Sequence, residues 1–191
     1  MSAQDRVRWD SVYNERNGRY PVADPLLFEY TFPLALYTQT DMERRALDLA
    51  CGLGQNGIWL ASQGYIVDMM DISRTALMRA RNEVEKRRLR NVNLLQVDLE
   101  AVHLSRQNYD LICVFRYLRR ELFPQIVNSV RGGGRIIYET FNTNYLEQVP
   151  GFNPDFLLEP GEIASYFEGW EILYCDEEHE TTQFVAQKPR H

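Results

Sequence analysis

The sequence predicts an α/β domain: a three-layer sandwich with a doubly wound, mostly parallel sheet of seven strands and an antiparallel final strand. Short apolar segments alternate with helical patterns along most of the 191 residues, which is typical of parallel strands joined by right-handed crossovers. Only a short linker separates the last two apolar segments, as in an antiparallel connection. We expect the domain at residues 41–191 and, at residues 1–40, an extension packed on it.

Turn and helix signals bound each expected strand. The first strand ends in the glycine-rich segment 51–57, and Ser73 is a good N-cap for a helix that runs to about residue 89. The glycine run 132–134 predicts a turn before the fifth strand. The strands are expected at residues 46–50, 65–70, 92–97, 109–115, 135–140, 170–174 and 183–187, and further helices at 58–61, 120–130 and 161–167.

Composition and charge exclude several classes of function. Apolar residues make up 45% of the chain and charged residues 25%, as in folded globular proteins. There is neither an apolar run of about 18 residues, which a membrane span needs, nor an N-terminal secretory signal. The net charge of −6 argues against a general nucleic-acid binder. Residues 136–187 hold eleven acidic residues and no Lys or Arg, so the rest of the chain is net positive.

The cysteines and histidines indicate the compartment and the absence of a metal site. Cys51, Cys113 and Cys175 are an odd number of widely spaced cysteines, and the three histidines do not cluster. This pattern predicts free thiols in a reducing cytoplasm, with neither disulfides nor bound metal.

Acidic residues stand at the ends of three successive predicted strands. Asp48 lies just inside the end of the first strand, Asp71 ends the second and Asp98 follows the third. In an open doubly wound sheet, ligands bind beyond the carboxyl ends of the strands. We therefore expect these side chains and the glycine-rich segment to meet at one edge of the sheet.

Gly52, Gly54 and Gly57 form a GxGxxG string between a predicted strand and a predicted helix. Glycines at this point allow a tight turn and a close approach to a ligand. Asp71 lies 19 residues beyond Gly52, where a carboxylate accepts hydrogen bonds from the hydroxyls of a ribose. These features alone fit either a dinucleotide or S-adenosylmethionine.

Three details favour S-adenosylmethionine. Asp48 would harm a pyrophosphate site, but would help to bind an amino-acid ammonium or to order the loop. Asp98 is placed to accept from an adenine amino group, and the helix after the loop has no phosphate-binding Lys. Taken singly, Asp71 and Asp98 each also fit a helix N-cap or a turn, and Gly54 a plain turn glycine.

The chain resembles a known family over nearly its whole length. ALDLACGLGQNG and VDMMDIS are similar to the cofactor motifs of Rossmann-like class I S-adenosylmethionine-dependent methyltransferases. The later motifs, and Trp9-Asp10-x-x-Tyr13, resemble the tellurite-resistance, or TehB-like, group. These later motifs are YDLICVFRYLRRELFP from residue 109, GGGRIIYETF from 132, NPDFLLEPGE from 153 and FVAQKP from 184.

The resemblance implies S-adenosylmethionine as cofactor and a role for each matching residue. The loop 50–54 would hold the methionine part, Asp71 the ribose, and Asp98 the adenine edge. Arg116, the one catalytic candidate, would lie near the reacting sulfonium. Members often carry His where this chain has Arg119, which leaves the choice of substrate open. The cofactor-binding residues expected on this basis are Trp9, Asp48, Ala50, Cys51, Gly52, Gly54, Asn56, Asp71, Ile72, Asp98, Leu99 and Phe115.

The resemblance further implies a small-molecule methyl acceptor, such as the soft anions tellurite or selenite, which need no general base. Arg116, Arg119 and Arg120 form a basic cluster that could guide an anion. Arg119 and Arg120 fit the solvated start of a helix equally well. No nucleic-acid or membrane partner is expected, and the sequence does not give an oligomeric state. Three aromatic residues near the fifth strand fit either a roof over the substrate or the core: Tyr138, Phe141 and Tyr145.

Two other functions stay open at this point. A nicotinamide-dependent oxidoreductase could use the same glycine loop, and a binding protein could keep the cofactor site without turnover. The basic run 74–90 could contact nucleic acid, but its apolar residues keep helical spacing, which favours the solvent face of a helix.

Overall fold

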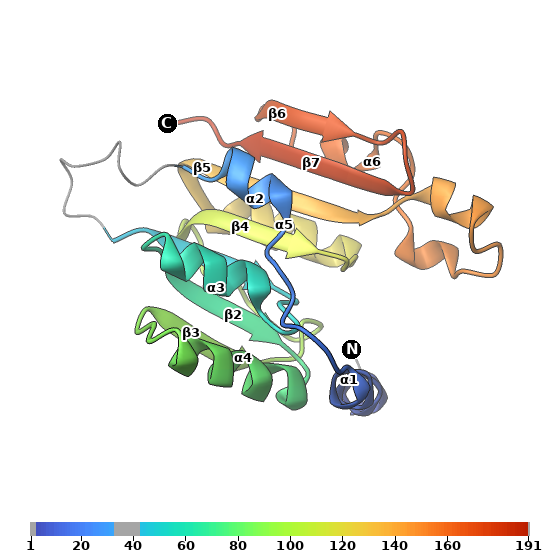
Figure 1. The fold of residues 1–191 in the computed structure, drawn as a ribbon. Coiled ribbons are helices and arrows are strands. Elements are labelled where there is room, and N and C mark those ends of the chain that lie inside the picture. The colour runs from blue at the N-terminus through green and yellow to red at the C-terminus, as the bar shows by residue number, and fades with distance from the viewer. Residues whose placement is uncertain (1–2, 33–42, 191) are drawn as a thin grey trace. The chain divides into compact units, whose positions relative to one another are not determined.

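The computed structural model describes residues 3–32 and 43–190. Seven strands form one sheet in the order β3-β2-β1-β4-β5-β7-β6 (Figure 1). The chain divides into two compact units, Met1–His103 and Leu104–His191, and each is described here by itself. The expected end of the N-terminal extension, near residue 40, lies outside the described residues.

The first unit contains three parallel strands and the helices that cover them. β1 (Arg45–Leu49) pairs with β2 (Ile66–Asp71), which in turn pairs with β3 (Val92–Gln96). Helices α3 (Gln55–Ser62) and α4 (Arg74–Lys86) lie on the same face of these strands (Figure 1). All five elements match segments expected from the sequence.

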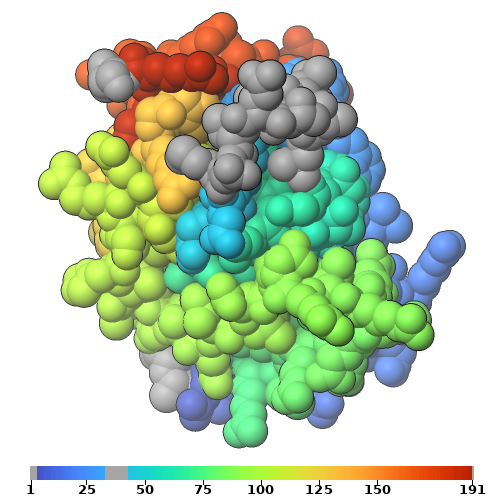
Figure 2. All heavy atoms as spheres, turned by 90° about the vertical axis from the view of Figure 1, so that its left-hand side faces the viewer, coloured from blue at the N-terminus to red at the C-terminus, as the bar shows by residue number. Residues whose placement is uncertain are grey.

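The amphipathic pattern of α4 explains its position. Its apolar stripe, which includes Ala76 and Ala80, is buried, while the atoms at its C-terminal end lie at the surface (Figure 2, green). Ser73 is the N-cap, as predicted, and its hydroxyl accepts from the backbone N–H of Ala76 at 3.1 Å. The helix ends three residues earlier than expected because Arg88 adopts a left-handed conformation with φ of 58°, which ends regular helix geometry.

Two helices precede the first strand. In α1 (Ala3–Glu15), the rings of Trp9 and Tyr13 lie on one side, as their spacing predicts, with centroids 6.0 Å apart. Pro25 begins the short helix α2 (Pro25–Tyr30). Proline is well suited to the first helical position because its missing N–H needs no partner there.

The second unit holds the other four strands. β4 (Tyr109–Phe115) and β5 (Val130–Phe141) are parallel. β7 (Thr181–Gln187) is antiparallel to both β5 and β6 (Glu171–Asp176). The predicted antiparallel final strand is therefore confirmed. The helical elements of the second unit are η2 (Arg120–Leu122), α5 (Phe123–Ser129), η3 (Thr143–Glu147), η4 (Pro154–Phe156) and α6 (Glu162–Ser165).

The glycine run 132–134 lies within β5, so the separate turn predicted before the fifth strand is wrong. The run is an irregular stretch of that strand: Tyr109 pairs with Val130 but Leu111 with Arg135, and Gly133 has a left-handed φ of 79°. The N–H of Gly133 donates to the carbonyl of Lys188, and the N–H of Lys188 donates to that of Gly134, both at 2.9 Å. These bonds extend the antiparallel pairing of β5 with β7 to Lys188. The helix expected over 120–130 is likewise divided into η2 and α5.

Three general expectations bear on location and metal binding. Cys51 and Cys113 are buried and Cys175 is exposed, and all three are free thiols. Within residues 3–32 and 43–190, no helix is long and apolar enough to cross a bilayer. The same residues contain no group of three His, Cys, Asp or Glu side chains placed to hold a metal ion.

Candidate active site

A tightly wound loop follows β1. Ala50, Gly52 and Gly54 all have left-handed backbones, with φ of 55°, 54° and 78°. This conformation costs about 1 kcal/mol for a residue with a Cβ, such as Ala50. The N–H of Cys51 donates to the carbonyl of Met70 on β2 at 2.9 Å. The loop is therefore fixed against the neighbouring strand.

Two glycines of the loop are needed for packing. A Cβ on Gly54 would collide with Cε of Met69, and one on Gly57 would lie 2.7 Å from Cγ of the same side chain. The sequence led us to expect that these glycines make room for a ligand. In the structure they make room for a methionine of β2.

Asp48, on β1, fixes the loop through a hydrogen bond to the start of α3. Its side chain is buried, and Oδ2 accepts from the N–H of Gly57 at 2.7 Å. The N-cap of α3 is Gly54, which has no side chain to cap the helix. Asp48 takes over this function from the preceding strand, and its negative charge suits a helix N-terminus. It therefore orders the loop, one of the two roles considered from the sequence.

Asp71 is buried at the end of β2 and is held by backbone groups. Its Oδ2 accepts from the N–H of Gly52 at 2.7 Å, and its Oδ1 from that of Ser73 at 2.8 Å. Burial raises the pKa of this carboxyl, and the two N–H groups oppose the rise. A carboxylate offers about four lone-pair sites, so Asp71 keeps acceptor capacity beyond these backbone bonds. A ribose hydroxyl of S-adenosylmethionine is a donor that suits it.

The third acidic residue follows β3. The N–H of Val97 donates to the carbonyl of Asp71 at 3.0 Å, which places Asp98 beside the end of β2. Oδ1 of Asp98 accepts from the N–H of Glu100 at 2.9 Å and forms a turn. Ile72 and Leu99, two of the expected cofactor-binding residues, are buried.

Two further candidates have structural roles. Burial, followed by the charges of Asp48 and Asp71, raises the pKa of the Cys51 thiol well above its ordinary value. The thiol is thus neutral and serves as a small packing residue. Oδ1 of Asn56 accepts from the N–H of Asp24 at 2.9 Å and holds the segment that begins α2.

The N-terminal segment supplies two tyrosines that the sequence analysis did not select. A Cβ on Gly52 would collide with the hydroxyl of Tyr13, so this ring lies directly on the loop with Trp9 stacked beside it. The hydroxyl of Tyr20 donates to the carbonyl of Leu53. The four-residue spacing of Trp9 and Tyr13 could have identified Tyr13, whereas no motif singles out Tyr20.

In the second unit, Phe115 ends β4 and Arg116 follows with a left-handed φ of 58°. Nη2 of Arg116 contacts Oε1 of Glu139 at 2.9 Å. Glu139 is only 3% exposed, and its Oε2 accepts from Nε2 of Gln183 at 2.6 Å. The charge of Arg116 is therefore balanced by a buried carboxylate. Glu139 was not predicted, although an acid within the apolar run IIYET was a visible signal.

A cluster of aromatic rings, which we call the aromatic cluster, adjoins this ion pair. It consists of Phe141, Tyr145 and Phe152, all partly exposed. The Arg116 guanidinium lies 4.7 Å from the Phe141 centroid, and Phe141 stacks on Tyr145 at 4.2 Å. Tyr138 is instead a core residue whose hydroxyl donates to the carbonyl of Tyr117.

Arg120 is a structural residue. Its guanidinium pairs with Glu162 at 2.6 Å and donates to the carbonyls of Asp155 and Leu157. Arg120 begins η2, which agrees with its interpretation as the start of a helix, but its guanidinium is bound by these partners and is not a free guide for anions. Arg119 lies 3.5 Å from Glu121.

Comparison with known proteins agrees with the sequence motifs. The sequence model of the TehB family, described as "Tellurite resistance protein TehB", matches residues 39–185. A Haemophilus influenzae protein named "Probable S-adenosyl-L-methionine-dependent methyltransferase TehB" is 30% identical over 142 residues, 70% of this chain and 48% of that protein. A Coxiella burnetii protein named "Ubiquinone biosynthesis O-methyltransferase" is 31% identical over 131 residues, 64% of this chain and 56% of that protein.

The fold comparison gives the same result. The crystal structure of TehB from Haemophilus influenzae aligns with a TM-score of 0.68 and 20% identity, over 85% of this chain and 65% of that one. The predicted fold class is thereby confirmed. The chain spans about half the length of the curated relatives it matches. It belongs to the TehB family of S-adenosylmethionine-dependent methyltransferases.

Proposed function

We propose that this chain transfers the methyl group of S-adenosylmethionine to a small-molecule acceptor. The observation that carries the proposal is Asp71, a buried carboxylate fixed by two backbone N–H groups beside a left-handed loop. Such a preformed acceptor suits the two hydroxyls of a ribose. The family assignment supports the same cofactor.

The cofactor supplies an electrophilic sulfonium methyl, so the protein's task is to bind and orient. Asp71 holds the ribose, the loop 50–54 the methionine part, and Asp98 with Leu99 the adenine. Phe115 and Arg116 are the residues we assign to the transferred methyl and the acceptor. The acceptor atom must lie about 3–3.5 Å from the methyl and in line, with water excluded. We assign no general base.

Binding of the cofactor is tested by calorimetry with S-adenosylhomocysteine, the demethylated product, and with NAD as the competing cofactor. We expect saturable binding of S-adenosylhomocysteine and none of NAD. Tight NAD binding without a response to S-adenosylhomocysteine would instead support the oxidoreductase that the glycine string left open.

The first acceptor class we propose is a soft anion such as tellurite or selenite. The description of the matched family supports it, as does the guanidinium of Arg116, whose side chain is 49% exposed. A soft anion attacks without a proton to remove, which agrees with the absence of an assigned base. A cytoplasmic location remains a prediction from the cysteines.

A second acceptor class, an aromatic hydroxyl or thiol, is favoured by a separate observation. Glu139 balances the charge of Arg116, and the guanidinium lies against the aromatic cluster. This surface suits a planar ring better than a small dianion. The Coxiella burnetii relative is named for an O-methyltransferase of ubiquinone biosynthesis.

A screen of methyl transfer, measured as release of S-adenosylhomocysteine, separates the two classes. Tellurite and selenite form one arm, and phenols and aromatic thiols form the other. Turnover in one arm alone assigns the class. Aliphatic thiols are tested as a further set of acceptors. If the chain binds the cofactor but methylates none of these compounds, the proposed transfer is contradicted.

A further inference from the structure

Helix α1 is held on the first unit by polar contacts. None of the side chains described in α1, residues 4–15, is buried, and Val7 and Val12 are 64% and 43% exposed. Burial of apolar side chains is the usual force that docks a helix. In α1 the rings of Trp9 and Tyr13 are only half-buried, so polar contacts add to what keeps α1 in place.

Two contacts join α1 to α4, and each caps a helix end. Oδ1 of Asp10 accepts from the hydroxyl of Ser73 at 2.6 Å and from the N–H of Thr75 at 2.9 Å. Asp10 thus reinforces the N-terminus of α4. In the other direction, Nη1 of Arg79 donates to the carbonyls of Tyr13 and Arg16, both at 2.6 Å. We call these two contacts the reciprocal caps.

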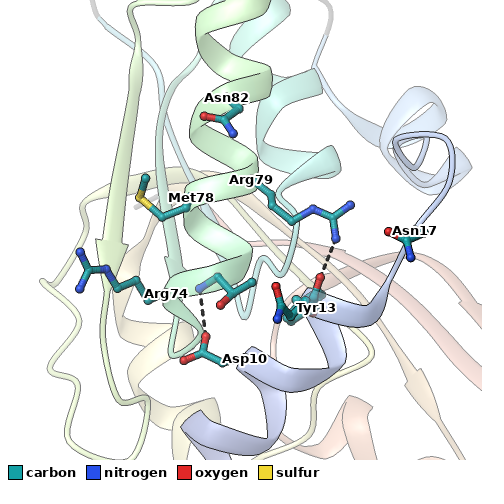
Figure 3. A pocket seen from close by; sticks show the side chains of 9 residues that line it. Asp10, Tyr13, Asn17, Arg74, Met78, Arg79 and Asn82 are labelled. Carbon is teal, nitrogen blue, oxygen red and sulfur yellow. Dashed lines mark hydrogen bonds between the residues drawn. The ribbon is translucent and has the colours of Figure 1, made fainter.

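Figure 3 shows how the reciprocal caps are arranged. Arg79 extends from α4 toward Tyr13, and Asp10 lies at the first turn of α4. Between the helices lies a polar groove of about 540 Å³, lined in part by Asn14, Asn17 and Asn82. The helices are therefore joined at the caps, with a polar cavity beside them.

The residue that the reciprocal caps position is Tyr13. Its hydroxyl lies against Gly52, whose N–H donates to Asp71. Burial, and then the charge of Asp71, raises the pKa of Tyr13, so the hydroxyl keeps its proton and stays a donor. A detached α1 would remove this donor from the loop.

We infer that Tyr13 contacts the cofactor at the Gly52 loop, and that Asp10 and Arg79 are positioning residues that act through Tyr13. Docking of α1 and binding of the cofactor then stabilise each other, because linkage between two equilibria is reciprocal. This inference rests on the proposed function, since it requires that the loop binds S-adenosylmethionine.

The test compares the affinity for S-adenosylhomocysteine, by calorimetry, of the variants Asp10→Ala, Arg79→Met and Tyr13→Phe. Loss of one cap raises the dissociation constant about tenfold if α1 must be docked for binding. The matched control is Arg81→Met, two residues from Arg79, which removes an exposed ion pair with Glu85. We expect the control to bind within about twofold of the unchanged chain.

A double-mutant cycle separates positioning from stability. In a Tyr13→Ala background, Arg79→Met should add little further loss of affinity, because its effect passes through the missing ring. The inference would be overturned if the losses of affinity from Arg79→Met and Tyr13→Ala were fully additive. It would also be overturned if Tyr13→Phe and Tyr13→Ala both bound S-adenosylhomocysteine with unchanged affinity. Because Tyr13→Phe removes a single oxygen, it keeps the test valid even if a cap variant does not fold.

Hydrogen exchange gives a second readout. Bound S-adenosylhomocysteine should slow exchange of the α1 amides in the unchanged chain and not in Arg79→Met. Equal exchange with and without ligand would contradict the coupling. Failure of the unchanged chain to bind S-adenosylhomocysteine at all would instead contradict the proposed function, so the two failures are distinguishable.

Discussion

The ends of β1 and β4 share a left-handed residue but differ in the groups that surround it. After β1, Ala50 has a left-handed φ of 55°, and after β4, Arg116 has one of 58°. Beside the first, the carboxylates of Asp48 and Asp71 are held by backbone N–H groups. Beside the second, Glu139 is held by two side chains.

The difference separates two kinds of site. Backbone donors are present whatever the side chains are, so the carboxylates at the β1 end have a fixed position, as the proposed cofactor site requires. The arrangement at the β4 end depends on the identity of Arg116 and Gln183, and it is the end that we propose for the acceptor. The following predictions test this contrast, from the largest expected effect to the smallest.

Asp48→Ala should have the largest effect. It leaves the N–H of Gly57 without its acceptor at the start of α3, and we expect unfolding free energy to fall by about 3 kcal/mol. Denaturant titration measures this change. Asp48→Asn keeps an acceptor oxygen and should recover most of the loss. Equal losses in both variants would show that charge, and not the cap bond, holds the loop.

Asp71→Asn should weaken S-adenosylhomocysteine binding about tenfold, because one acceptor for the ribose is lost. Asn offers one acceptor oxygen to the two backbone N–H groups that Asp71 binds, so the unfolding free energy should also fall, by about 1 kcal/mol. The pKa of Asp71 is raised in the folded state, so the folded state binds this proton more tightly than the unfolded state does. The contribution of Asp71 to the unfolding free energy therefore declines as pH rises through this range.

The same shift gives a pH dependence. Affinity of the unchanged chain should decline as pH falls through the pKa of Asp71, at a pH above the ordinary 3.8 of a carboxyl. Calorimetry over this range measures it. A decline only below 3.8, or the same profile in Asp71→Asn, would contradict the role of this carboxylate.

Glu139→Gln should change the acceptor step alone. It removes the negative partner of Arg116, so KM for an anionic acceptor should fall and kcat/KM for an aromatic one should drop roughly fivefold. The dissociation constant of S-adenosylhomocysteine should stay the same. Glu171→Gln, an exposed change at the start of β6, is the matched control. A changed cofactor affinity would contradict the separation of the two ends.

Ala50→Gly should have the smallest effect. Glycine adopts φ of 55° without a Cβ penalty, but it also increases the entropy of the unfolded chain. We expect a net stabilisation of about 0.5 kcal/mol, measured as a shift of the denaturation midpoint. A marked loss of stability would mean that the Ala50 methyl group contributes packing at the loop.

The sequence predicted the regular parts of the fold because burial imposes periodicity. The stripe of α4, with Ala76 and Ala80, and the limits of β4 follow from that periodicity. The glycine run 132–134 was assigned to a turn, because its pairing with Lys188 depends on a segment more than fifty residues later. Local signals do not contain such partners.

The candidate site divides in the same way. Strand-end carboxylates such as Asp71 were found because topology brings strand ends together. Glu139 and Tyr13 were not selected, since their roles arise from contacts with Arg116 and Gly52 that only the folded chain makes. The contacts of Arg120 with Asp155, Leu157 and Glu162 were not predicted, because these partners lie more than thirty residues later in the chain.

The distribution of the thiols has a practical consequence. With Cys51 and Cys113 enclosed and Cys175 on the outside, a maleimide dye should react at a single position on β6 in the native protein. That position lies in the second unit, remote in sequence from both α1 and the glycine loop. The unaltered chain therefore offers a ready site for a fluorescent reporter without engineering of its cysteines.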